Sequence, residues 1–103
     1  MTGEEVAPAE LQAAVESTHG GRATLRDVVP VHETFQDQTV WEGSVHVFSL
    51  QGHPSANTAY AWSSPVEGSK RRRFYAVLHT PPVDSPAAAV RAAIVSDHRS
   101  SEG

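Results

Sequence analysis

The spacing of apolar residues changes twice along the chain. Within residues 8–19 they recur three or four positions apart, as Leu11 and Val15 do, which is the spacing of one helix face. Between residues 22 and 80 the spacing is shorter, and β-branched and aromatic residues gather in short runs that are typical of strands. The helical spacing returns over residues 86–96. The pattern therefore predicts a helix near each end of the chain and strands between them.

The residues at the expected helix ends agree with this prediction. Pro8 and Pro86 suit the first turn of a helix, because a backbone N–H there would have no partner within the helix. Ser85 is a typical N-cap residue, and Gly20 and Gly21 should end the first helix.

Turn-forming residues divide the middle of the chain into four strands. We expect these strands at 23–34, 39–50, 56–63 and 70–80. The connections between them are too short for a parallel crossover, so neighbouring strands should be antiparallel. Pro30 lacks the N–H that a strand ladder needs, which favours an edge position or a bulge for the first strand.

These elements predict an α+β fold, a four-stranded antiparallel meander sheet with the element order αββββα. The most economical arrangement places both helices on one face of the sheet. We expect a single domain over 1–103, with an ordered core at about 8–96, a frayed N-terminus and a frayed tail at 97–103. The residues predicted to be buried together are Leu11, Val15, Phe74, Leu78, Val90 and Ile94.

The second expected strand has apolar residues on both of its faces. Trp41, Val45 and Val47 share one parity, whereas Phe48 and Leu50 share the other. A bulge near Val47 would bring the two halves to one face.

The last two strands supply a candidate binding surface. Tyr60 and Trp62 share one face of the third strand, and the small Ala59 and Ala61, which suit a closely packed helix, share the other. If both helices cover the alanine face, the aromatic face stays open. The candidate binding residues on that open face are Tyr60, Trp62, Arg71, Arg73, Tyr75 and His79.

Exposed tryptophan, tyrosine and arginine are enriched at protein contact sites. The sequence therefore favours a non-catalytic binding or interaction module, whose partner is another protein or a second copy of the chain. The competing explanation is that the aromatic residues fill the core of a small domain.

Basic residues are concentrated late in the chain. The net charge is −4, but residues 70–103 hold six bases and three acids, and four of those bases are consecutive, from Lys70 to Arg73. Arginine can neutralise phosphates while aromatic rings stack bases, so nucleic-acid binding is one alternative function. The acidic net charge and the pI of about 5.8 disfavour it.

No sequence motif indicates a catalytic or metal site. The chain has no cysteine, and its six histidines form no metal-binding spacing such as His-x-His. A nucleophile elbow, a phosphate loop and a dinucleotide-binding glycine motif are also missing from the sequence. We therefore expect no metal and no cofactor. A small enzyme with a shallow cleft is the other alternative function.

Two features of the sequence bear on the cellular setting. It contains no apolar run long enough to span a membrane, and its acidic first residues do not resemble a signal peptide. Seven of the eight basic residues are arginine, a usage typical of bacterial genomes rich in G and C. We expect a small cytoplasmic bacterial protein that does not bind membranes.

Overall fold

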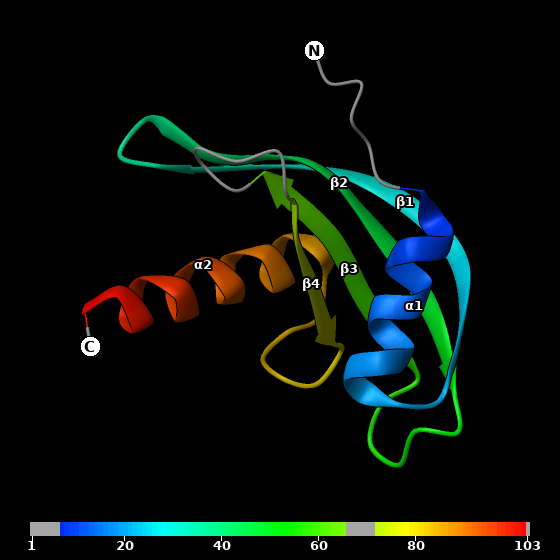
Figure 1. Cartoon of the computed structure of the whole chain (residues 1–103). Coiled ribbons are helices and arrows are strands. Elements are labelled where there is room, and N and C mark those ends of the chain that lie inside the picture. The colour runs from blue at the N-terminus through cyan, green and yellow to red at the C-terminus, as the bar shows by residue number, and fades with distance from the viewer. Residues whose placement is uncertain (1–6, 66–71, 103) are drawn as a thin grey trace.

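The computed structural model describes residues 7–65 and 72–102 of the chain (Figure 1). The fold is of the predicted α+β class, with four antiparallel strands in one open sheet and a helix at each end. The described part of the chain has no helix with the length and apolar content that crossing a membrane would require. The elements are α1 (Pro8–His19), β1 (Arg22–Phe35), β2 (Gln38–Gln51), β3 (Thr58–Pro65), β4 (Arg72–Leu78) and α2 (Pro86–Glu102).

The ends of the helices lie close to where the sequence predicts them. Ser85 caps α2, because its Oγ accepts a hydrogen bond from the N–H of Ala88 at 3.1 Å. Gly20 and Gly21 follow α1 with φ angles of 82° and 80°, which favour glycine. The C-terminal end differs, since α2 continues to Glu102, beyond the predicted end at residue 96.

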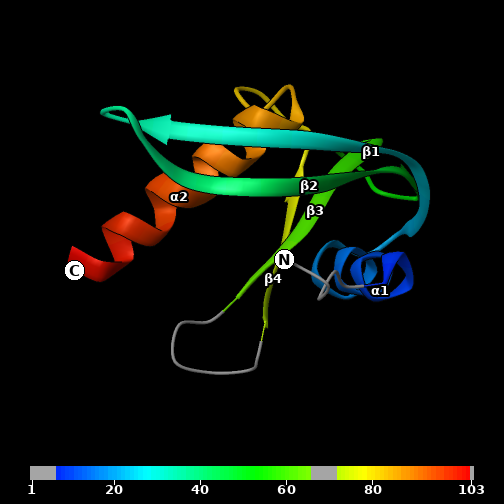
Figure 2. The ribbon, with the colours of Figure 1, turned by 90° about the horizontal axis from the view of Figure 1, so that it is seen from above.

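The sheet order is β1-β2-β3-β4, and the strands pair over very different lengths. β1 and β2 pair from Arg22↔Gln51 to Phe35↔Gln38, joined by a two-residue turn, whereas β3 pairs with β2 only over residues 46–49. The remainder of this long hairpin, residues 28–45, therefore extends past the β2–β3 pairing, and we call it the hairpin arm. Figure 2 shows the arm diverging from the end of β3 and the start of β4.

The two helices cover opposite faces of the sheet, so the expectation that both cover one face is wrong. α1 packs on one side, where its Leu11 and Val15 contact Phe48 and Ala59. α2 packs on the other side (Figure 1), where its Val90 belongs to the same core cluster as Trp62. The physical reason is that both faces of β3 are apolar, and one helix can cover only one of them.

The predicted core is therefore divided between two clusters. Leu78 packs against the cluster that contains Leu11 and Val15, as predicted. Val90 and Ile94 belong instead to the cluster beneath α2. The prediction for Phe74 is wrong, because this side chain is 38% exposed.

The mixed parity of β2 has the same explanation. Val45 and Val47 lie in the cluster beneath α2, while Phe48 and Leu50 lie in the cluster beneath α1. The bulge expected near Val47 is not in β2. The register shift at this level lies on β1, between Leu25 and Asp27, opposite Phe48 and Val47.

β1 is an edge strand, as Pro30 indicated. Besides pairing with β2, its first residues are hydrogen bonded to side chains of α1. Gln12 donates a hydrogen bond to the carbonyl of Ala23 at 2.6 Å, and Glu16 accepts one from the N–H of Ala23 at 2.8 Å. These bonds satisfy both backbone groups of a fully buried residue.

Candidate functional site

The aromatic residues of the predicted binding surface lie inside the protein. Tyr60 and Trp62 are 4% and 2% exposed, and α2 covers them. The premise of an open aromatic face is therefore wrong. The competing explanation, that these residues fill the core, describes their packing correctly.

One line of contacts leads from this cluster to the surface. Trp62 stacks on Tyr75, with ring centroids 5.2 Å apart and planes 12° apart, and meets Trp41 edge to face at 6.1 Å. The guanidinium carbon of Arg73 lies 5.3 Å from the Tyr75 centroid, in a cation–π contact. Of the six predicted residues, Arg73 is exposed and Tyr75 is half-buried, while Arg71 lies outside the described residues.

Tyr60 and His79 form a second contact within the predicted set. The Tyr60 hydroxyl is hydrogen bonded to Nδ1 of His79, and the two ring centroids lie 5.8 Å apart. Burial raises the pKa of Tyr60, and the negative charge of Asp84 adds to the effect. The pair joins the residue that follows β4 to the middle of β3. This position indicates a structural role for both side chains.

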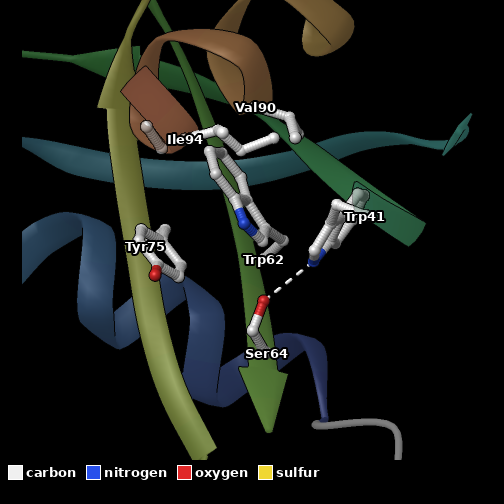
Figure 3. Close-up of a pocket in the computed structure, with 7 residues that line it drawn as sticks. Trp41, Trp62, Ser64, Tyr75, Val90 and Ile94 are labelled. Atoms are coloured by element: carbon white, nitrogen blue, oxygen red, sulfur yellow. Dashed lines mark hydrogen bonds between the residues drawn. The ribbon is translucent and has the colours of Figure 1, made fainter. Parts of the chain in front are cut away.

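A small cavity lies beneath α2 at the point where the hairpin arm and β3 diverge (Figure 3). Trp41, Trp62 and Tyr75 line it together with Val90 and Ile94. The indole N–H of Trp41 donates a hydrogen bond to Ser64 Oγ at 2.8 Å, which links β2 to β3 beyond their last backbone pairing. The cavity volume is about 30 Å³. That volume holds a water molecule, but it is far below the several hundred Å³ of a ligand pocket.

Titratable side chains are dispersed over the described residues. Within residues 7–65 and 72–102, no group of three or more histidines and carboxylates could hold a metal ion. His32 is hydrogen bonded through Nε2 to Thr39 Oγ1 at 2.7 Å.

The large hydrophobic side chains that remain exposed gather on the hairpin of β1 and β2. Among the described residues, six such side chains are more than about a third exposed, and four of them belong to this hairpin. The four are Leu25, Val28, Phe35 and Val40. Sequence reasoning missed this surface, although the greater length expected for the first two strands than for the third was a signal that their hairpin would project.

The hairpin arm has one covered side and one uncovered side. α2 covers the side that carries Val31 and Val45. Residues of the opposite side are recognised by their alternation along β1 and by the pairing of His32 with Glu42. We call this uncovered side the arm surface, and its exposed residues are Val28, Pro30, His32, Val40 and Glu42.

The charges of the arm are of one sign. No lysine or arginine occurs between Arg26 and Lys70, so the arm carries acidic side chains and neither of these two basic ones. Glu33 is bound to Arg91 of α2, with contacts of 3.0 and 3.2 Å to the guanidinium. Asp37 and Glu42 are both exposed.

Comparison of the chain with protein-family models, with curated proteins and with solved structures finds no match. The candidate site therefore depends on the geometry of the molecule itself. That geometry separates the predicted aromatic residues, which are buried or half-buried, from the exposed apolar residues of the hairpin. The aromatic cluster stabilises the interior, whereas the arm surface faces solvent.

Proposed function

We propose that this protein is a non-catalytic protein-interaction module and that the arm surface is its contact site. The observation that carries the proposal is that four of the six exposed large hydrophobic side chains of the described residues lie on one projecting hairpin, and that two of them, Val28 and Val40, lie on the arm surface. Apolar groups that stay in solvent lose the free energy of burial, so a cluster of them on a small domain indicates a surface that a partner covers.

The backbone of the arm suits this role. Two paired strands hold Val28 and Val40 on a fixed surface, and α2 packs against the reverse side. Less conformational entropy is therefore lost on binding than a flexible loop would lose. We propose the same cellular setting as before, the cytoplasm of a bacterium, on the basis of composition alone.

The alternative functions have less support. Base stacking needs several exposed rings, whereas Tyr60 and Trp62 are buried and Tyr75 is half-buried, which leaves Phe74 as the exposed ring of β4. The cavity beneath α2 is too small for a substrate.

Two matched valines provide the test. Val40 on the arm and Val95 on α2 are both 47% exposed. Replacing either valine with threonine exchanges one methyl group for a hydroxyl, so both substitutions reduce the exposed apolar area similarly. We expect Val40→Thr to lose partner proteins from a bacterial lysate by about tenfold, measured by quantitative mass spectrometry of affinity-captured material. The Val95→Thr control should keep them.

The free energy of unfolding of both variants should lie within about 1 kcal/mol of the wild-type value, because the changed side chains are exposed. Chemical denaturation of each variant checks this point. Equal recovery of every partner by the arm variant and the control would contradict the proposed function.

A further inference from the structure

On the side of β2 that faces β3, the arm lacks a partner strand among the described residues. β2 pairs with β3 only over residues 46–49, although it stays paired with β1 along the arm. The N–H of Leu50 donates to the carbonyl of Asn57 at 2.9 Å, so Leu50 and every second residue before it point their backbone groups toward β3. Glu42 and Ser44 belong to this series. We call the N–H and C=O groups of these two residues the inner edge.

β3 is poorly suited to complete this edge with backbone hydrogen bonds. Continued pairing would place Ser44 opposite Ser63. The Ser63 carbonyl, however, already accepts a hydrogen bond from the Arg72 guanidinium at 3.3 Å. The next pair, Glu42 and Pro65, would lack a donor because Pro65 has no N–H. The described part of β3 therefore leaves the inner edge open.

The opposite edge of the arm, on β1, is closed to strand pairing. Val29 pairs with Val45 and points its backbone groups toward β2, so Val28 and Pro30 point theirs away from it. The N–H of Val28 donates to Asp27 Oδ1 at 2.8 Å, and Pro30 has no N–H. Edge strands are often protected in this way against pairing with other chains. The inner edge contains no proline, so this protection covers only one side of the arm.

The side chains around the inner edge favour a segment of particular composition. On the α2 side, the indole of Trp41 lies over Gly43, where a Cβ would come within 2.9 Å of the ring, and it lines the cavity of about 30 Å³. On the other side, Glu42 is exposed and negatively charged. Side chains of an added strand alternate between these two sides. The segment should therefore place small apolar residues toward Trp41 and a lysine or arginine beside Glu42.

We propose that the inner edge of β2 binds an extended segment of another protein, which adds to β2 as a strand on the side of β3. This inference deepens the proposed function of the arm and rests on it. Glu42 and Ser44 each offer one donor and one acceptor, so the segment gains about four backbone hydrogen bonds. A single segment fits this site better than a second copy of the arm, which would bring two strands. The β2–β3 pairing at residues 46–49 closes one end of the site.

Strand addition should change the surroundings of Trp41. Its indole N–H now reaches from β2 to Ser64 Oγ of β3 at 2.8 Å (Figure 3). A strand next to β2 would lie between these two groups, so this hydrogen bond should break. The two tryptophans of the chain, Trp41 and Trp62, both line the cavity. Tryptophan emission of the whole protein should therefore report binding.

A phage-displayed library of random peptides of about twelve residues provides the probe. Synthetic copies of the selected peptides should bind with a dissociation constant of about 100 µM or tighter, measured by tryptophan emission. In the bound protein, hydrogen exchange at the N–H groups of Glu42 and Ser44 should slow by at least about tenfold, measured by NMR. Exchange at His32, on the β1 edge, should not change.

A matched pair of variants tests the backbone contact. Ser44→Pro removes one N–H of the inner edge and should weaken peptide binding by at least about tenfold. Ser44→Ala keeps that N–H and should bind within about twofold of the wild type. Circular dichroism shows whether Ser44→Pro is folded. If it is not, exchange in the wild type decides, together with Glu42→Gln, which should weaken binding of peptides that contain lysine or arginine.

The inference is overturned if no selected peptide binds this tightly, or if a bound peptide slows exchange at neither Glu42 nor Ser44. A folded Ser44→Pro that binds as Ser44→Ala does would also overturn it. Capture from a bacterial lysate separates this failure from that of the proposed function. If Ser44→Pro keeps the partners that Val40→Thr loses, the arm surface remains the contact site and only the inner edge is excluded. If Val40→Thr and Val95→Thr recover every partner equally, the proposed function itself fails.

Discussion

Tyr60 buries a ring in the cluster beneath α2 while its hydroxyl still needs a hydrogen-bond partner. His79 supplies that partner through Nδ1. The bond holds the residue after β4 against β3, next to the connection that carries the chain over to α2. A hydroxyl in this position stabilises the fold only while it is protonated, because a buried phenolate would lose its hydration.

Tyr60 should therefore ionise at a higher pH than an exposed tyrosine does. Its contribution to the free energy of unfolding should be lost at alkaline pH. Its pKa is raised in the folded state, so its contribution is complete below the unfolded pKa of about 10 and is lost as pH rises through the folded pKa. Absorbance at 295 nm during a base titration, compared between the wild type and Tyr60→Phe, isolates this ionisation. The substitution should cost about 0.5–1.5 kcal/mol at pH 8, with a smaller difference at pH 11. A Tyr60 signal with a midpoint at or below pH 10 would contradict the role of burial.

At the scale of elements, the faces of the strands decide which residues hold the fold together. Phe48 and Phe74 are both on the α1 side of the sheet, since Phe48 pairs with Ala59 and Phe74 pairs with Ser63. Only Phe48 lies beneath α1. Phe74 is on the same side but beyond that cover, which makes it part of the surface.

Truncation of these two residues measures the difference. Phe48→Ala should lower the free energy of unfolding by about 3–5 kcal/mol, because Phe48 is 0% exposed and leaves a cavity. Phe74→Ala should cost less than about 1.5 kcal/mol. Urea denaturation of both variants gives the two values. Equal losses would return Phe74 to the core.

The order and type of the elements could be predicted from the sequence, because their signals are local. Pro86 and Ser85 mark a helix start wherever the helix packs. The side on which a helix packs is not local. Ala59 and Ala61 favour a helix packed on one face of β3. On the other face, the aromatic side chains of Tyr60 and Trp62 fit either an open binding surface or one that a helix covers.

At the scale of the whole molecule, the protein is a thin three-layer structure with one helix on each side of the sheet. Its radius of gyration of 13.5 Å is close to the value of about 13 Å expected for a compact domain of this length, in spite of the projecting arm. The arm is fastened by the Glu33–Arg91 ion pair and the Trp41–Ser64 hydrogen bond. Both contacts join residues far apart in the sequence.

This dependence on distant contacts explains why the candidate site could not be predicted. The exposed state of Val28 and Val40 follows from where β3 stops pairing with β2, and no residue near either valine encodes that point. Arg73 is exposed, and its charge favours that position in any fold because burial penalises a charge. Tyr60 and Trp62 carry no such penalty, so their sequence positions left both outcomes open.

The four residues at 59–62 of β3 are all buried, because each face of the strand has its own helix. The substitutions that this strand tolerates should therefore differ from those that its neighbours tolerate. In a library of single substitutions sorted for folded protein, polar residues should be rejected at four successive positions of β3, without the alternation that a strand with one solvent face produces. In β1, where most side chains are exposed, most positions should accept them. Alternating acceptance along residues 59–62 would mean that one of the two helices is dispensable.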